Sequence, residues 1–268
     1  GEGPLMLFLH GFPQFWYSWR HQLPEFATDH RAVAIDLRGY NDSDKPRGRE
    51  PYRIQHLTDD VKAVIDELGG GKATLVGHDW GGVIAWAYAH RYQQTLDRLV
   101  VINAPHPARM RDELKTPGQF LKSWYIFFFQ LPKLPELALT LGHSRAVGKA
   151  IEDDGGDGAA AVPEDLDRYR DAFSVPGVAT SSVNYYRNFL SGARSQPRRL
   201  APIEVPGLLV WGEQDKALGI RLASGNETFI PDLSVRTLAH GGHFVHEQCP
   251  AEVNGIIRSF LSGSGEKS

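Results

Sequence analysis

Residues 73–83 read Ala-Thr-Leu-Val-Gly-His-Asp-Trp-Gly-Gly-Val, an apolar run followed by an aspartate with a glycine two positions away on either side. The run 73–76 predicts a buried strand, and residues 83–92 carry a helical pattern. Glycine tolerates a strained backbone and leaves room for close contacts. The segment therefore predicts a sharp strand-to-helix turn that holds Asp79 near a helix N-terminus, where a carboxylate stays ionised.

This turn matches a motif with a known chemical use. The pattern small-x-Asp-x-small corresponds to the nucleophile elbow, Gly-x-Ser-x-Gly, with Asp79 in the position of the serine. The plainer interpretation is a helix-capping aspartate followed by closely packed glycines. The rest of the chain has to decide between the two, because a motif match is a hypothesis until its context is found.

Apolar runs alternate with helical patterns in the first hundred residues and again after residue 202. The runs are apolar throughout, which is typical of parallel strands covered on both faces. Between the second and third runs, apolar residues recur at three- and four-residue steps from Ile54 to Leu68. This order predicts an α/β fold with a mostly parallel sheet flanked by helices. The predicted strands are 5–9, 32–35, 73–76, 99–102, 208–211 and 233–238.

The middle of the chain interrupts this rhythm with helical patterns and no clear strand. We expect a core domain formed by residues 1–104 and 198–268, with residues 105–197 inserted as a helical cap, or lid. An Asp/Gly stretch at 153–158 lacks the ligand spacing and the closing Glu of a calcium loop, so a solvated loop is expected there. The two helical stretches of the cap are 120–141 and 163–190.

Composition excludes several classes of protein. The 268 residues include 29 Lys and Arg against 32 Asp and Glu, a net charge of −3 that gives no electrostatic footprint for nucleic acid or an anionic membrane. The single cysteine, Cys249, rules out an internal disulfide, and no run approaches the roughly 20 apolar residues of a membrane span. We expect a cytoplasmic protein. The start at Gly1 indicates the trimmed part of something longer, so a lost targeting signal and the oligomeric state stay open.

Two loops after predicted strands supply a histidine and a carboxylate. Asp215 follows the strand 208–211, and His243 follows the strand 233–238. The order Asp79, Asp215, His243 is the nucleophile, acid, histidine order of α/β-hydrolases. The acid could instead follow the strand 99–102, but Asn103 stands there and cannot act as a carboxylate. A lone loop aspartate is the plainer interpretation of Asp215, and Glu213 is the alternative acid.

A third loop supplies expected hydrogen-bond donors. His10-Gly11-Phe12-Pro13 ends the first strand, where α/β-hydrolases place one backbone N–H of an oxyanion hole; the other comes from the residue after the nucleophile. Those donors are Phe12 and Trp80 here. An ordinary strand-ending turn is the plainer interpretation.

The histidines 240, 243 and 246 raise the question of a metal site. Their three-residue spacing contains glycines, which argues against a shared helical ligand face, and the chain has no His-Glu-x-x-His pattern. We expect neither a metal nor an organic cofactor.

Taken together, the chain resembles the epoxide hydrolases of the α/β-hydrolase superfamily. The resemblance implies two cap tyrosines that hold an epoxide oxygen. Tyr125 stands before Phe129-Gln130-Leu131-Pro132, and Tyr186 lies in Asn184-Tyr185-Tyr186-Arg187; aromatic core packing is the plainer interpretation of both. Trp80, Phe128 and Tyr185 are the expected substrate contacts. The matching segments are 10–13, 16–20, 36–40 and 77–82, with Asp215 and His243.

Aspartate suits this chemistry better than serine. An epoxide carbon is saturated, so attack by serine would leave an ether that water does not cleave, whereas a carboxylate leaves a hydrolysable ester. The expected function is conversion of an apolar epoxide and water to a vicinal diol, through an ester on Asp79 that is hydrolysed by water activated by the His243/Asp215 pair.

Three other functions remain as alternatives. A haloalkane dehalogenase uses the same Asp, His and Asp, but many place an asparagine where Phe12 stands, and paired tyrosines serve an oxygen better than a halide. A haloacetate dehalogenase is expected to carry arginines where Trp80 and Val83 stand. A receptor without turnover is possible on any enzyme fold, although it needs no complete set of catalytic side chains.

Overall fold

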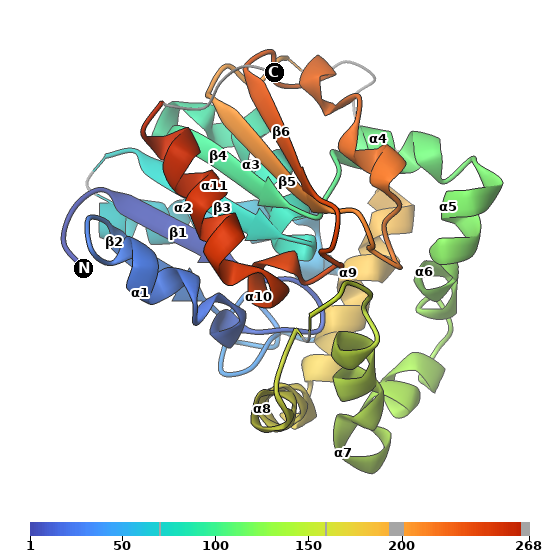
Figure 1. The fold of residues 1–268 in the computed structure, drawn as a ribbon. Coiled ribbons are helices and arrows are strands. Elements are labelled where there is room, and N and C mark those ends of the chain that lie inside the picture. The colour runs from blue at the N-terminus through green and yellow to red at the C-terminus, as the bar shows by residue number, and fades with distance from the viewer. Residues whose placement is uncertain (70, 159, 193–200, 264–268) are drawn as a thin grey trace.

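The structure is a computed structural model that describes residues 1–69, 71–158, 160–192 and 201–263. Six strands form one sheet in the order β2-β1-β3-β4-β5-β6, and every neighbouring pair is parallel (Figure 1). This confirms the predicted α/β fold. The strands are β1 (Leu5–Leu9), β2 (Arg31–Ile35), β3 (Ala73–His78), β4 (Leu96–Ile102), β5 (Gly207–Gly212) and β6 (Leu233–Leu238).

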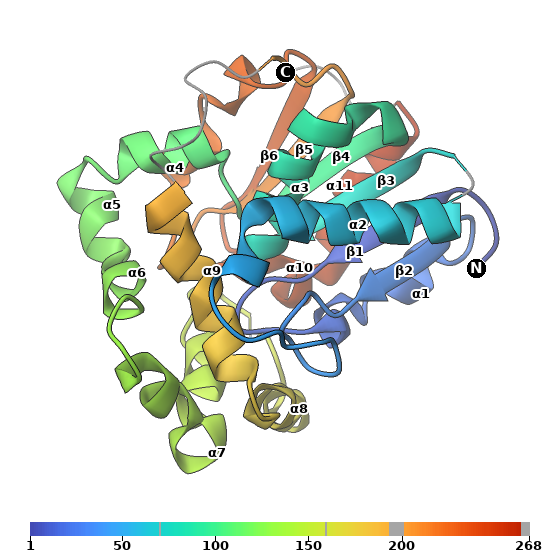
Figure 2. The same ribbon diagram turned by 180° about the vertical axis from the view of Figure 1, so that it is seen from behind.

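Helices cover both faces of the sheet. α1 (Gln22–Phe26) and α11 (Pro250–Leu261) lie on the face seen in Figure 1, and α2 (Ile54–Gly69) and α3 (Trp80–Tyr92) on the face seen in Figure 2. Successive strand residues point to opposite faces, so both sets of side chains become buried. In β1, Leu5, Leu7 and Leu9 pack on the α2/α3 side, whereas Met6 and Phe8 pack on the α1/α11 side.

The segment between β4 and β5 forms helices, with no strand among its described residues. It lies beyond the carboxyl ends of the strands (Figure 1). We call residues 105–197 the cap segment; its expected end at 197 lies outside the described residues. Its helices are α4 (Pro107–Glu113), α5 (Pro117–Lys122), α6 (Trp124–Phe128), α7 (Leu134–Glu152), α8 (Pro163–Ser174) and α9 (Val178–Gly192).

Short helical turns complete the loops around the sheet. They are η1 (Trp16–Trp19), η2 (Glu50–Tyr52), η3 (Gln93–Thr95), η4 (Ile220–Ala223), η5 (Asn226–Thr228) and the four-residue α10 (Val245–Gln248). Among the described residues, no helix is long and apolar enough to span a membrane.

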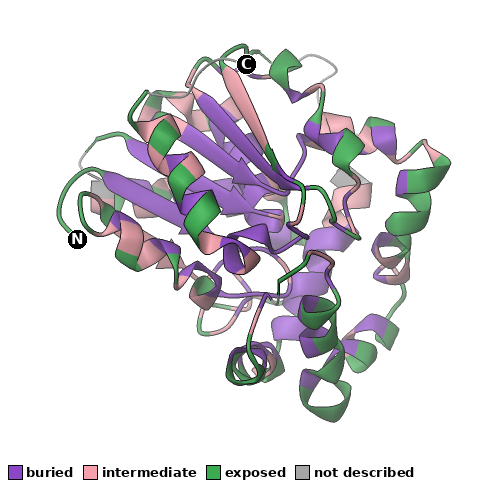
Figure 3. Ribbon diagram, in the orientation of Figure 1, coloured by how far each residue is buried: buried purple, intermediate pink, exposed green. Residues whose placement is uncertain are grey.

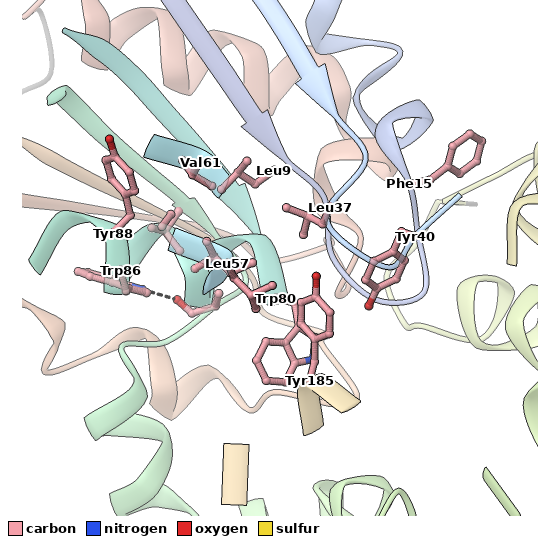
Figure 4. Close-up of a cluster of buried hydrophobic side chains, with 14 of the residues drawn as sticks. Leu9, Phe15, Leu37, Tyr40, Leu57, Val61, Trp80, Trp86, Tyr88 and Tyr185 are labelled. Atoms are coloured by element: carbon pink, nitrogen blue, oxygen red, sulfur yellow. Dashed lines mark hydrogen bonds between the residues drawn. The ribbon is translucent and has the colours of Figure 1, made fainter. Parts of the chain in front are cut away.

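The sheet and the inner helix faces form the core, and the outer helix faces are exposed (Figure 3). Close to the carboxyl end of the sheet, Trp80, Tyr185 and Leu37 pack together (Figure 4). On the inner side of α3, the indole N–H of Trp86 donates to the carbonyl oxygen of Ala104 at 3.1 Å. That bond fixes α3 to the residue just before the cap segment.

Candidate active site

Asp79 occupies a strained turn between β3 and α3. Its backbone angles are φ 48° and ψ −117°, in the left-handed half of the map that a residue with a side chain rarely adopts. Such strain costs about 1–3 kcal/mol and persists only where the surroundings impose it. A Cβ at residue 81 would overlap the carbonyl oxygen of Leu9, so glycine is required for α3 to begin this close to β1. The predicted sharp turn is therefore present, with Asp79 at its apex.

The Asp79 carboxylate is held between a backbone donor and a histidine. The Phe12 N–H donates to its Oδ1 at 2.8 Å, and Oδ2 lies 3.6 Å from His243 Nε2. Burial alone would raise the pKa of Asp79, but the His243 imidazole and the Phe12 N–H outweigh that effect and lower the pKa below its usual value. The carboxylate is thus ionised at neutral pH. The second expected donor, Trp80, begins α3 directly after it.

His243 is oriented by Asp215. The His243 Nδ1 lies 2.7 Å from Asp215 Oδ2, and this carboxylate is 1% exposed. Asp215 Oδ1 accepts the backbone N–H groups of Ala217 and Leu218 at 2.8 and 2.7 Å. Burial alone would lower the pKa of His243, but the charge of Asp215 and the bond to it raise the pKa well above its usual value.

Asn103 is a part of this site to which the sequence motifs gave no role. Its Nδ2 donates to Asp215 Oδ2 at 2.8 Å, and its Oδ1 accepts the Gly212 N–H at 2.9 Å. Its φ of 41° is another left-handed backbone angle. The sequence signal for Asn103 was a polar residue at the end of a buried strand. From the sequence, that position indicated only that no catalytic acid follows this strand. Asn103 thus helps to hold in place the carboxylate of Asp215, which follows β5.

Tyr125 and Tyr186 line the same cavity as Asp79. The cavity measures about 50 Å³ and lies between the carboxyl end of the sheet and helices α6 and α9. The two tyrosine rings meet edge to face, with centroids 5.8 Å apart. Burial raises the pKa of both phenols, and the charge of Asp79 raises them further, so both hydroxyls keep their protons. The apolar lining includes Trp80, Val83, Pro107, Met110, Ile126 and Leu218.

Two of the three expected substrate contacts lie away from this cavity. Trp80 lines it, but the hydroxyl of Tyr185 donates to the Arg38 carbonyl at 2.7 Å. Figure 4 shows the Tyr185 ring beside Trp80 with its hydroxyl pointing toward Leu37. Phe128 packs against Trp124 and Phe129 instead of lining the cavity. Adjacent helical residues point about 100° apart, so of the two neighbouring tyrosines only Tyr186 turns inward.

The three histidines of the 240–246 loop have different partners. His243 contacts the two aspartates, whereas His246 is buried against the ring of His78 at 4.4 Å. Burial lowers the pKa of His246 and of His78 well below its usual value, so both are neutral. His240 Nε2 pairs with Glu252 at 2.9 Å, and Cys249 completes a group whose ligand atoms lie within 4.8 Å of one another. That group is separate from the cavity, and exposed acidic side chains are common without an ion.

Comparisons with known proteins agree with this arrangement. The family described as alpha/beta hydrolase fold matches residues 4–250. Epoxide hydrolase 4 of Mus musculus is 39% identical over 264 residues, covering 96% of this chain and 73% of the mouse protein. The AB hydrolase superfamily protein YfhM of Bacillus subtilis (strain 168) is 38% identical, covering 97% of this chain and 91% of that protein. The crystal structure of a Bacillus megaterium epoxide hydrolase in complex with an inhibitor superimposes with a TM-score of 0.90 at 36% identity, covering 98% of this chain and 94% of the other.

The fold and the site together define a hydrolase of the α/β class. A carboxylate stands at the turn after β3, the loop after β6 brings a histidine to it, and the loop after β5 brings an aspartate to that histidine. The chain belongs to the epoxide hydrolase family of the α/β-hydrolase superfamily. This confirms the resemblance that the sequence motifs indicated.

Proposed function

We propose that this hydrolase converts an apolar epoxide and water to a vicinal diol through a covalent ester on Asp79. The observation that carries the proposal is that an ionised carboxylate and two protonated phenols, Tyr125 and Tyr186, line one small apolar cavity. A carboxylate can attack a saturated carbon, and phenols can donate to the oxygen that leaves it.

The first step is a displacement at an epoxide carbon. A carboxylate oxygen of Asp79 forms the C–O bond, the ring C–O bond breaks, and its electron pair goes to the epoxide oxygen. Tyr125 and Tyr186 donate hydrogen bonds to that oxygen, and one of them supplies its proton. A well-placed acid of this kind contributes about 10²–10⁴-fold to the rate. The product is a hydroxyalkyl ester on Asp79.

The second step hydrolyses this ester. His243, oriented by Asp215, removes a proton from water, and the hydroxide attacks the ester carbonyl carbon. The negative charge then develops on the other Asp79 oxygen, where the N–H groups of Phe12 and Trp80 form the oxyanion hole. One such donor contributes about 3 kcal/mol to transition-state stabilisation. The acyl C–O bond breaks, His243 returns its proton to the departing oxygen, and the diol leaves with an oxygen that belonged to Asp79. The new Asp79 carboxyl group then loses its proton to the phenolate left by the first step, which restores both groups.

A single turnover in ¹⁸O-labelled water tests this proposal, because the route fixes where each oxygen goes. With enzyme in excess over an aryl or alkyl epoxide, the label should enter the Asp79 carboxylate, and the first diol formed should carry none. Peptide mass spectrometry measures the protein, and mass spectrometry of the diol measures the product. Label in the diol from the first turnover, with none on the peptide, would show direct attack by water on the epoxide and would reject the ester.

The dehalogenase and receptor alternatives are tested with the same preparation. Chloride release from an alkyl chloride of the same chain length should be much slower than diol formation, because the tyrosine hydroxyls stabilise a leaving oxygen better than a halide. Faster halide release than diol formation would favour a haloalkane dehalogenase. A thermal shift caused by epoxides without any turnover would favour a receptor.

A further inference from the structure

The loop formed by residues 153–158 is solvated only in part: Asp153, Asp157 and Gly158 are exposed, as the sequence indicated, but Asp154 is buried. It follows α7 within the cap segment and runs toward α10, as the yellow-green trace in Figure 1 shows. There it contacts both loops that carry His243 and Asp215. The Lys216 N–H donates to the Asp154 carbonyl at 3.4 Å, and the Asp157 N–H donates to the His240 carbonyl at 2.9 Å.

The side chain of Asp154 makes the closest contact with the histidine loop. It is 6% exposed, and its Oδ2 accepts the N–H of Phe244, the residue after His243, at 2.8 Å. Its Oδ1 accepts from Gln248 Nε2 at 2.9 Å. Gln248 Oε1 in turn accepts the N–H of Gly242, the residue before His243, at 2.7 Å. Asp154 therefore holds the backbone on both sides of His243, directly on one side and through Gln248 on the other.

The glycines of this loop explain how the approach is possible. Gly155 and Gly156 have φ angles of 101° and 83°, a region that other residues rarely adopt. A Cβ at residue 155 would overlap the Gln214 carbonyl oxygen, and one at residue 156 would lie 2.7 Å from the Gly242 nitrogen. The sequence Asp-Asp-Gly-Gly-Asp-Gly thus fits a loop that is wedged between two others.

The charge of Asp154 is complementary to that of His243. Burial raises the pKa of Asp154 to about 6, while the Phe244 N–H and the charge of His243 act in the opposite direction. The carboxylate is therefore ionised above about pH 6, where it adds to the field of Asp215 that favours a protonated imidazole. No step of the reaction proposed above uses this carboxylate.

We propose that Asp154 is a positioning residue for the second step of the reaction, through which the cap segment holds His243 in line with Asp215 and the ester. This inference rests on the proposed function, because it assigns Asp154 to one of the two half-reactions. Ring opening by Asp79 does not need His243 as a base. Hydrolysis of the ester does, so a displaced His243 slows the second step alone. A merely structural role for Asp154 would affect both steps together.

The test compares the Asp154→Asn variant with the wild-type enzyme. Asparagine keeps the shape and one acceptor but loses the charge, and it presents an NH₂ group to one of the two donors. Rapid quenching followed by intact-protein mass spectrometry gives separate rate constants for ester formation and ester hydrolysis. We expect hydrolysis to slow by about tenfold or more, since hydrogen bonds to a charged group are lost, while ester formation stays within about twofold. The ester should accumulate.

The neighbouring carboxylate provides a matched control. Asp153, the first residue after α7, is exposed, and its Oδ2 lies 3.9 Å from the Nζ of Lys149 in that helix. The Asp153→Asn variant makes the same chemical change one residue away, and both of its rate constants should match the wild type. Equal slowing in the two variants would show a general effect of charge in this loop and would overturn the proposal.

A second variant keeps the proposal testable if Asp154→Asn does not fold. Gln248→Met removes the link from Asp154 to Gly242 at similar size, and it should also slow hydrolysis selectively. If neither folded variant slows hydrolysis, or if both steps slow equally, the positioning role is wrong. If the wild-type enzyme turns over epoxide without any ester on Asp79, the proposed function itself fails, and the two failures are distinguished by the wild-type data alone.

Discussion

At the scale of single residues, the site is organised by the charges around His243. Asp79 and Asp215 both face the imidazole, at 3.6 and 2.7 Å, and both raise its pKa. In the proposed mechanism, formation of the ester removes the negative charge of Asp79 and with it one of these two influences on the pKa of His243. Ester formation therefore lowers the pKa of His243, so the imidazole loses its proton more readily just before it has to act as the base for hydrolysis. Substrate chemistry and protonation are coupled in this way.

The two half-reactions should consequently differ in their pH dependence. Ester formation needs ionised Asp79, whose pKa is lowered, so its rate constant should be flat from neutral pH down to about pH 4. Ester hydrolysis needs neutral His243, whose pKa Asp215 still raises, so its rate constant should increase as pH rises through that pKa. Rapid-quench measurements from about pH 4 to about pH 9 check both rate constants. Hydrolysis that slows with rising pH would contradict the role of His243 as the base.

The two cavity tyrosines should be needed for ring opening and not for hydrolysis. Changing either Tyr125 or Tyr186 to Phe should slow ester formation by about 10²-fold or more, and changing both should abolish it. Tyr185→Phe is the matched control, because its hydroxyl bonds the Arg38 carbonyl outside the cavity. It should leave ester formation within a few-fold of the wild type. If the double variant opens epoxides at the wild-type rate, the assignment of the tyrosines is wrong.

The sequence indicated which side chains would lie together where each one sits in a local motif, while their catalytic roles stay predictions. Asp79, Asp215 and His243 each follow a strand, and parallel strands bring their carboxyl ends to one edge, so these residues meet as expected. Asn103 and Asp154 act through contacts between distant segments, and no local pattern reports such contacts. Their positions became evident only from the packing of three loops.

At the scale of elements, the sheet was more predictable than the cap segment. The strands β1 and β6 have the predicted bounds, and the others differ by one to three residues at an end. The predicted helix 163–190 is instead two helices, α8 and α9, with Val175-Pro176-Gly177 between them and a φ of 94° at Gly177. The Pro-Gly pair signals a turn, but apolar residues keep a helical spacing on both sides of it, so the sequence pattern does not show where the first helix ends. Likewise, 120–141 spans parts of three helices, α5, α6 and α7.

The junction of β3 and α3 should tolerate no added side chain. A Cβ at residue 81 would overlap backbone atoms of β1, which cannot move aside, so Gly81→Ala should lower the melting temperature strongly and abolish ester formation. Gly255→Ala is the control within α11, because a methyl group there would meet no neighbouring atom within 4 Å. Removing this helical glycine should stabilise the protein by about 0.5–1 kcal/mol. Similar thermal unfolding of both variants would contradict the close approach at the elbow.

At the scale of the whole molecule, a buried polar cluster joins the cap segment to the sheet domain. Arg20, after η1, pairs with Glu247 of α10 and with Asp165 of α8, the latter at 2.9 Å. Tyr169 of α8 and Gln14 also donate to the Glu247 carboxylate. The Glu247 side chain is fully buried, so its charge depends on these partners. The cluster connects α8 to the short helix that follows His243.

Removing the cation of this cluster should destabilise the fold. Burial already raises the pKa of Glu247 to about 7, so in Arg20→Met this carboxyl takes up a proton while the bonds to Arg20 are lost, and we expect a loss of about 1–3 kcal/mol of unfolding free energy. Lys62→Met is the control, because Lys62 pairs with exposed Asp66 on α2, and such surface pairs contribute little. Denaturant unfolding of both variants measures the difference. Equal stability of the two would show that the cluster does not hold the cap segment to the domain.

Trapping the ester would show whether Asp79 forms a covalent bond to the substrate. A His243→Ala variant keeps the nucleophile but lacks the base for hydrolysis, so mixing it with an aryl or alkyl epoxide should add one substrate mass to the protein. Peptide mapping should place this mass on Asp79, and it should persist for many wild-type turnover times. If this variant releases diol rapidly without an adduct, and an Asp79→Ala variant still forms diol, Asp79 is not the nucleophile.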